Sequence, residues 1–111
     1  MGVKIYFKGK TMIAELEGEI DHHNAKDIRE SIDMSINKKS PATLNLDFGG
    51  IQFMDSSGIG LIMGRYKNMQ LKGGKLKITN IPDHLERMVK LSGIGALGVI
   101  EKGSEKNESY K

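Results

Sequence analysis

Apolar and polar residues alternate at the start of the chain, in two runs separated by a short polar segment. In the first run, 3–7, Val3, Ile5 and Phe7 occupy every second position, which is the period of a strand with one buried face. The second run, 12–18, continues the alternation, and the Lys-Gly-Lys between the runs is typical of a tight turn. The pattern predicts that the chain opens with a β-hairpin.

A helical period follows over residues 21–39. Ile28, Ile32 and Ile36 recur at a spacing of four, which places them on one face of a helix. Asp21 precedes this stripe. We expect its carboxylate to accept hydrogen bonds from the free amides of the first helical turn.

The middle of the chain returns to a strand and then to a second helix. The range 43–48 alternates as a strand does, and the glycine pair 49–50 is expected to end it. From Ser57 the pattern is helical, until a glycine pair at 73–74 stops it. The apolar stripe of this helix is predicted to be Ile59, Ile62, Met63, Tyr66 and Met69.

The remaining elements complete an alternating order of strands and helices. A strand is predicted at 75–79, a short helix with Pro82 at its first position, and a last strand at 96–100. Helices between strands favour parallel pairing, whereas the hairpin adds an antiparallel pair. The predicted fold is one α/β domain over 1–100, with a mixed sheet flanked by helices, and a polar tail at 101–111 that is a frayed helix or disordered.

The composition narrows the classes of function. The chain has 111 residues, which suits one domain, and no cysteine, which excludes disulfides and thiolate-bound metals and is compatible with the cytoplasmic location we expect. Its 17 basic and 14 acidic residues are interleaved and aromatic residues make up only 5%, which argues against nucleic-acid binding. No apolar run approaches the roughly 18 residues of a membrane span. We therefore expect neither nucleic acid nor membrane as a partner.

The segment Asp-Ser-Ser-Gly at 55–58 carries the candidate chemistry. It stands where an apolar strand gives way to a helix, and its simplest interpretation is a helix cap. A nucleophile elbow requires Gly-x-Ser-x-Gly, and Asp55 occupies the first glycine position. The same residue types also occur in a catalytic triad, here of Ser57, His22 and an aspartate, in a phosphate cradle and in a phosphorylation site.

The remaining motif-like segments predict no cofactor and no metal. The range 93–98 fits Gly-x-Gly-x-x-Gly, but it follows a helix and opens a strand, whereas the dinucleotide fingerprint follows a strand and opens a helix. His22 and His23 are adjacent, so on a helix they would point about 100° apart rather than toward one ion.

Glycines interrupt the predicted second helix at unusual frequency. Gly58, Gly60 and Gly64 each cost about 1 kcal/mol of helix stability relative to alanine. The spacing of four places Gly60 and Gly64 on one bare face. Such a face lets another backbone approach closely, and that backbone belongs either to the domain's own sheet or to a partner protein.

Three segments resemble the anti-sigma factor antagonists of the STAS family. They read ELEGEIDHHNA, LNLDFGGIQFMDSSGIGLIMGRYK and GGKLKITNIPDHLERMVKLSGI. The resemblance extends from about Val3 to Ile100 and is strongest to the sporulation members, which oppose the anti-sigma-F factor. FMDSSGIGLIMGRYK is its most specific part.

The resemblance implies a mixed sheet flanked by helices and a regulatory protein that is not an enzyme. In this family the unphosphorylated antagonist binds an anti-sigma factor, which is itself a serine kinase, and thereby frees the sigma factor. The resemblance implies that this kinase phosphorylates Ser57, that the phosphorylated form no longer binds productively, and that a phosphoserine phosphatase resets it. The partner-binding residues it implies are Asp21, Asp55, Ser56, Gly58 and Ile59.

Several functions stay open beside this one. Asp21 is either a simple helix cap or the partner of a basic residue on the anti-sigma factor. The chain is alternatively a STAS module of another partner-switching pathway, such as stress signalling, or a small serine hydrolase. Its tail also differs from that of relatives, which usually close with a helix that contains apolar residues, whereas 101–111 is polar.

Overall fold

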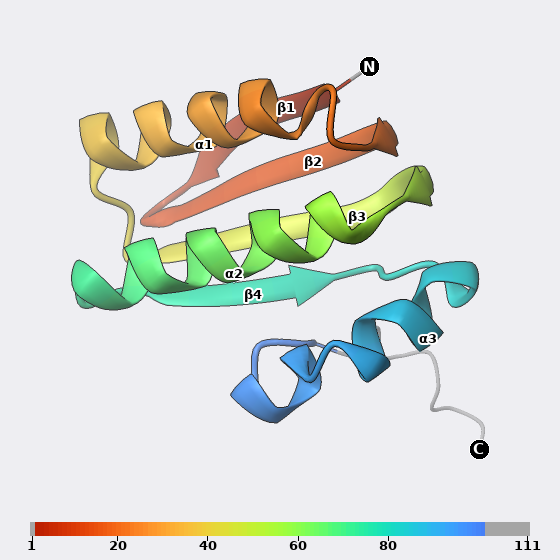
Figure 1. Ribbon diagram of the computed structural model, residues 1–111. Coiled ribbons are helices and arrows are strands. Elements are labelled where there is room, and N and C mark those ends of the chain that lie inside the picture. Colours follow the sequence, from red (N-terminus) through yellow and green to blue (C-terminus); the bar gives the residue numbers. More distant parts are fainter. Residues whose placement is uncertain (1, 102–111) are drawn as a thin grey trace.

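The structure, a computed structural model that describes residues 2–101, contains one four-stranded sheet with helices packed against it (Figure 1). The strands lie in the order β1-β2-β3-β4, with β1 antiparallel to β2 and the other neighbours parallel. The predicted mixed sheet with an opening hairpin is therefore confirmed. The strands are β1 (Gly2–Lys8), β2 (Thr11–Ile20), β3 (Thr43–Met54) and β4 (Lys75–Thr79).

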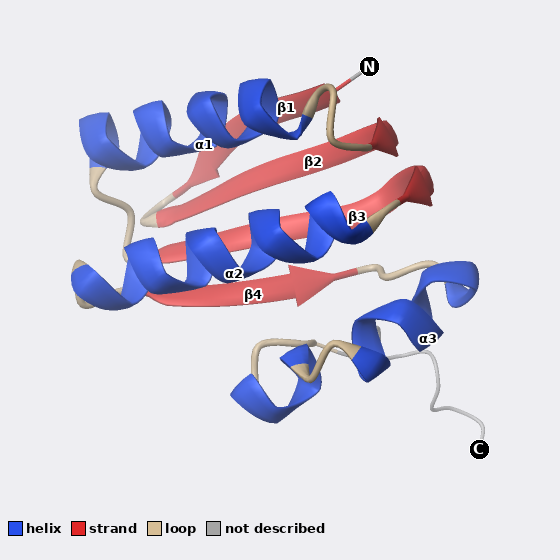
Figure 2. Cartoon of the chain, in the orientation of Figure 1, coloured by secondary structure: helices blue, strands red, loops and turns tan. Residues whose placement is uncertain are grey.

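Two helices cover one face of this sheet. Figure 2 shows α1 (Ala25–Lys39) and α2 (Ser56–Leu71) side by side over the strands, whereas α3 (Asp83–Leu91) lies beyond the β4 edge. Each of α1 and α2 connects two parallel strands, as such a crossover requires. Among the helices in residues 2–101, none is long and apolar enough to cross a lipid bilayer.

The core lies between the sheet and these two helices. The inward residues of β3, Leu44, Leu46 and Phe48, are completely buried, as their alternation predicts. Ile32 and Ile36 of α1 are equally buried, which confirms the helical stripe. Removal of these apolar side chains from water provides the main driving force that holds the helices on the sheet.

Strand β3 is longer than the sequence predicts, because the glycine pair 49–50 does not end it. The strand continues to Met54, and β2 follows it through two register shifts, at Glu15/Glu17 and Gly18/Glu19. A Cβ added to Gly50 would lie 3.0 Å from the Leu16 carbonyl oxygen. The glycine therefore permits a close approach of the two backbones at the irregularity, and pairing resumes beyond it.

The predicted last strand at 96–100 is wrong except at its end. Residues Ile94–Leu97 form a short 3₁₀ helix, and only Ile100 forms a parallel bridge, to Ile78. Gly93 and Gly98 flank the 3₁₀ helix with φ values of +85° and +72°. These left-handed conformations turn the chain back, so that little length remains for a strand.

Two helix starts also differ from prediction by a few residues. Helix α1 begins at Ala25, after a turn that starts at Asp21. Pro82 precedes α3 as its N-cap with an extended ψ of 149°, rather than occupying the first helical position. Of the predicted tail, only Glu101 lies among the described residues, so the domain boundary at residue 100 and the state of the tail stay predictions.

The buried side of α2 is rotated relative to the predicted stripe. Leu61 and Arg65 are buried along with Ile62 and Met69. By contrast, Ile59, Met63 and Tyr66 are only partly buried. Arg65 is 5% exposed and is the only charged side chain in residues 2–101 that the fold buries almost completely. Because a hydropathy pattern assigns a charged residue to the exposed face, it could not identify this side of α2 as buried.

An ion pair between the two helices accounts for the burial of Arg65. Its Nε lies 2.9 Å from Oδ1 of Asp33 on α1. The same oxygen accepts a hydrogen bond of 3.1 Å from the Asn68 amide group. Burial lowers the pKa of Arg65, and the Asp33 carboxylate opposes that shift. The pair therefore fixes α2 against α1.

Replacement of Asp33 should destabilise the fold more than replacement of another acidic residue on the same helix. Asp33→Ala leaves the buried Arg65 guanidinium without its counter-charge, and we expect a loss of about 2 kcal/mol in the free energy of unfolding. Urea denaturation measures this loss. The matched control is Glu30→Ala, since Glu30 is 56% exposed and its ion pair within residues 2–101 is with the neighbouring Arg29, at 4.0 Å. Equal effects of the two substitutions would contradict the structural role of the pair.

Candidate functional site

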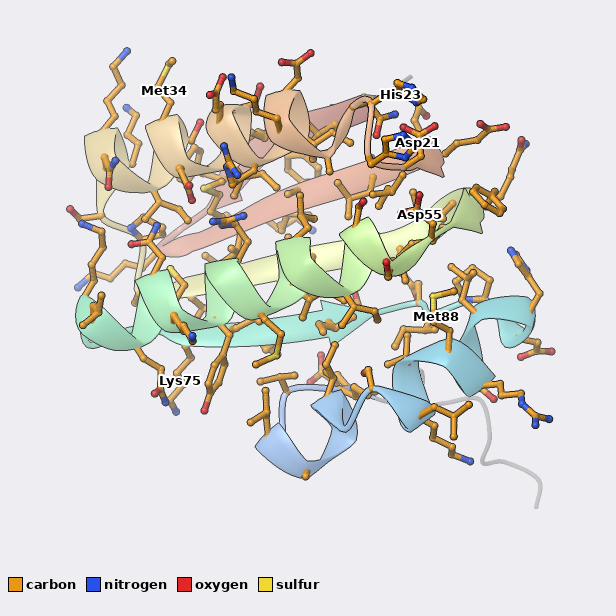
Figure 3. All side chains as sticks on the ribbon, in the orientation of Figure 1. Asp21, His23, Met34, Asp55, Lys75 and Met88 are labelled. Atoms are coloured by element: carbon orange, nitrogen blue, oxygen red, sulfur yellow. The ribbon has the colours of Figure 1, made fainter. Side chains whose placement is uncertain are left out.

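The candidate site lies at the carboxyl ends of two neighbouring parallel strands. Ile20 and Met54 are paired at the ends of β2 and β3, so the residues that follow them emerge at one edge of the sheet. These are Asp21 and Asp55. Figure 3 shows both side chains at that edge together with His23. A hydrogen bond of 3.0 Å from the Asp55 amide to the Ile20 carbonyl ties the two chain segments together.

Asp21 organises the turn that precedes α1. Its Oδ1 accepts hydrogen bonds from the amides of His23 at 2.9 Å and Asn24 at 3.1 Å. In the opposite direction, the Asp21 amide donates a hydrogen bond of 3.0 Å to Oδ1 of Asn24. Nδ2 of Asn24 also donates to the Glu19 carbonyl. Asp21 thus caps a turn rather than the first helical turn, since the helix starts only at Ala25.

Asp55 caps α2 as the sequence predicts. Its backbone is extended, with φ −98° and ψ −170°, and its Oδ1 accepts a 2.8 Å hydrogen bond from the Ser57 amide. The pKa of Asp55 is lowered, chiefly because of this amide; the Ser57 hydroxyl and His22 add to the effect, and partial burial opposes it. Asp55 is therefore a carboxylate at neutral pH, at the positive end of the helix dipole.

The two hydroxyls of the motif differ in exposure. Ser56 is exposed and Ser57 is half-buried, so both are accessible from outside. Exposure alone therefore does not identify Ser57 rather than Ser56 as the phosphorylation site. What distinguishes Ser57 is its attachment to the capping carboxylate through the amide, which fixes its backbone at the start of α2.

Two glycines of α2 face open space and one faces the core. A Cβ added to Gly60 or Gly64 would meet nothing within 4 Å. A Cβ added to Gly58 would collide with Cγ and Sδ of Met54. The bare face formed by Gly60 and Gly64 is therefore not covered by the domain's own sheet. Gly58 serves the packing of α2 on β3, and its predicted contact with a partner stays a prediction.

A pair of histidines connects the two aspartates, a connection that the sequence pattern does not predict. Nδ1 of His22 lies 3.7 Å from Oδ2 of Asp55, and Nδ1 of His23 lies 3.9 Å from Oδ1 of Asp21. The two ring centroids are 4.1 Å apart. In the sequence, the sign of this cluster is the pair of adjacent histidines directly after a strand. That His22 faces Asp55 depends on the register of the sheet, which the sequence pattern does not give.

Other chemical interpretations of the site receive little support from its geometry. Residues 2–101 contain no group of three or more histidine, aspartate or glutamate side chains placed to hold a metal ion. The His22 ring is 73% exposed and its Nδ1 is directed at Asp55. A serine hydrolase instead requires the imidazole to accept the proton of the serine hydroxyl in a substrate pocket.

An apolar side chain also lies at this edge. Phe53, next to the end of β3, is 51% exposed. Ile59, in the first turns of α2, is half-buried. Phe53, Ile59 and the bare glycine face thus belong to the segments on either side of Asp55, and they offer surface that can lose water on contact with another protein.

Comparison with known proteins gives a consistent result. Residues 3–105 match the STAS domain family. The anti-sigma F factor antagonist of Paenibacillus polymyxa is 36% identical over 75% of this chain and 71% of its own length. The anti-sigma-B factor antagonist of Bacillus subtilis is 30% identical over 81% of each chain.

Solved structures agree with the sequence relatives. The unphosphorylated anti-sigma factor antagonist SpoIIAA superposes with a TM-score of 0.81 at 28% identity and covers 94% of this chain and 90% of its own. The phosphorylated form of the Bacillus cell fate determinant SpoIIAA gives a TM-score of 0.74 at 28% identity, over 94% and 93% of the two chains. One fold therefore accommodates both phosphorylation states of that protein.

The glycines of α2 should respond oppositely to alanine. Gly58→Ala should lower the free energy of unfolding by about 2 kcal/mol, because the new methyl group overlaps the buried Met54 side chain. Gly60→Ala should raise it by about 0.5–1 kcal/mol, because it adds helix propensity in open space. Thermal or urea unfolding distinguishes them. A gain in stability from Gly58→Ala would show that α2 does not pack on β3 as described.

Proposed function

The chain belongs to the STAS domain family, and from this premise we propose that it is an anti-sigma factor antagonist switched off by phosphorylation of Ser57. The unphosphorylated chain binds an anti-sigma factor that is also a serine kinase, and this binding frees the sigma factor. A phosphoserine phosphatase restores the active form. In this function the protein is a regulator and a kinase substrate rather than an enzyme.

The observation that carries the proposal is the capped junction between β3 and α2. Ser57 is accessible, yet its backbone is held by the Asp55 carboxylate, and Asp55 is itself bonded to the end of β2. A kinase gains most of its catalysis from positioning the acceptor hydroxyl in line with the γ-phosphate. A serine fixed at the start of a helix meets that requirement better than one on a loose loop.

Phosphorylation at this position need not unfold the domain. A phosphoserine adds about −1.5 to −2 charge units, and the positive end of α2 tolerates negative charge at its first turn. The likeness to SpoIIAA in its phosphorylated form supports a fold that persists after modification. The switch therefore acts at the interface with the partner.

Binding is proposed to use the surface around the site. Asp21 and Asp55 supply negative charge, Ser56 and Ile59 lie beside them, and the face of Gly60 and Gly64 allows a partner backbone to approach. A phosphate dianion buried there without a counter-charge costs several kcal/mol. About 4 kcal/mol corresponds to a thousandfold loss of affinity.

A second pathway has a specific observation in its favour. The likeness to the anti-sigma-B factor antagonist of Bacillus subtilis supports a stress-type partner in place of a sporulation partner. Either pathway uses the same switch, and either is consistent with a cytoplasmic protein that binds no nucleic acid. Capture of the cognate anti-sigma factor from each pathway on the purified chain separates the two.

The phosphorylation site is tested with the two neighbouring serines. Incubation with the cognate anti-sigma kinase and ATP should add one phosphate to the wild-type chain and to Ser56→Ala, and none to Ser57→Ala, as read by intact-mass and peptide mass spectrometry. Ser57→Asp should bind the anti-sigma factor more weakly than wild type by tenfold or more in calorimetry. Phosphate on Ser56, or undiminished binding by Ser57→Asp, would refute the proposal.

Asp21 is tested with a substitution that retains hydrogen bonding and removes charge. Asp21→Asn can still accept from the amides of His23 and Asn24, so the melting temperature should change little. If Asp21 pairs with a basic residue of the anti-sigma factor, affinity should fall about tenfold. A drop in stability with unchanged affinity would instead assign Asp21 to the turn alone.

A further inference from the structure

His22 occupies a position between the turn before α1 and the start of α2. Its Nδ1 faces Oδ2 of Asp55 at 3.7 Å. The other carboxylate oxygen of Asp55, Oδ1, holds the Ser57 amide at 2.8 Å. The Ser57 side chain interacts with the same carboxylate. A group added to the Ser57 hydroxyl therefore lies next to the carboxylate that His22 faces.

Within residues 2–101, few charged or titratable side chains lie close to His22. From α2 it faces Asp55. From its own turn it faces the His23 ring, with centroids 4.1 Å apart, and His23 in turn faces Asp21 at 3.9 Å. No lysine or arginine forms an ion pair with Asp55 in the described part of the chain. Among the described residues, His22 and His23 are therefore the groups of this site that can become cations by proton uptake, and His22 is the one that faces Asp55.

Building on the function proposed above, we propose that His22 is the counter-charge of phosphorylated Ser57. Phosphorylation favours proton uptake from solvent by the imidazole, so near neutral pH the modified site carries a fraction of a negative charge less than the phosphate alone would give it. The pH then sets the net charge of the switched-off site.

The chemistry of both groups places this effect near neutral pH. A free imidazole titrates at about pH 6.5, and the second ionisation of a phosphoserine lies at about pH 6. A nearby opposite charge favours the charged form of each group. By linkage the stabilisation is reciprocal: the dianion retains the proton on His22, and the imidazolium retains the dianion.

This coupling has a consequence for the switch. At higher pH the imidazole is neutral, so the full charge of the phosphate dianion acts on the partner. At lower pH the imidazolium compensates part of the charge that repels the partner. The discrimination between unphosphorylated and phosphorylated chain should therefore be greater at pH 8 than at pH 6. The second ionisation of the phosphate acts in the same direction, so the share that His22 contributes is the part of this pH dependence that His22→Gln removes.

The experiment compares histidine titrations in the full chain with and without phosphate. Phosphoserine is incorporated at position 57 by genetic code expansion, so the sample does not depend on any kinase. The carbon-bound ring protons of His22 are followed by NMR between pH 5 and pH 9. We expect their titration midpoint to rise by about 0.5–1 pH unit on phosphorylation.

Two controls isolate the effect. His84, which lies on α3 and whose Nε2 contacts the Gln52 carbonyl rather than Asp55, should shift much less than His22. In the phosphorylated His22→Gln variant, the phosphorus resonance should titrate at a higher pH than in the phosphorylated wild type, because the dianion has lost its cation. His22 is largely exposed, so this substitution should leave the melting temperature unchanged.

The outcomes separate this inference from the proposed function. Coincident His22 titrations in the two forms, or a shift no larger than that of His84, would overturn the role of His22 even if a kinase modifies Ser57. A clear His22 shift and its reciprocal phosphorus shift would support it. Failure of the cognate kinase to phosphorylate Ser57 would overturn the proposed function, whereas the NMR result would still report on His22.

Discussion

The parallel pairing of β2 with β3 out to their last residues is the constraint on which the site depends. Met54 reaches the level of Ile20, and the Asp55 amide closes the pairing on the Ile20 carbonyl. Because the two strands end together, the turn that follows one and the helix that follows the other start side by side. A shorter β3, ending at the glycine pair, would have left Asp55 and Ser57 at a different distance from Asp21.

The helices convert this edge into a rigid platform. Helix α2 is held on the sheet by burial of Leu61, Ile62 and Met69. The ion pair of Arg65 with Asp33 holds it against α1. Its N-terminus is therefore fixed at the same edge as the Asp21 turn. A hydroxyl on such a platform can be modified without loss of the fold, since the energy that stabilises the domain resides in the core beneath it.

Electrostatics gives the site its sensitivity. Two carboxylates lie at one edge, each approached by one histidine, and the histidine rings lie against one another. A phosphate on Ser57 would add further negative charge to an edge that already carries these two carboxylates. Proton uptake by His22, as proposed above, would offset part of that charge.

Local pattern in the sequence was sufficient for the hairpin, the α1 stripe, the inward face of β3, the strand at 75–79 and the cap at Asp55. The periods of strands and helices are properties of neighbouring residues, which is why these features could be predicted. The resemblance to a family, rather than any period, selected Ser57 over Ser56. Only the tertiary structure decided that β3 continues through Gly49 and Gly50, that Arg65 is buried against Asp33, and that His22 faces Asp55. Each of these depends on strand register and on contacts between residues distant in the chain, and a local pattern carries no information about either.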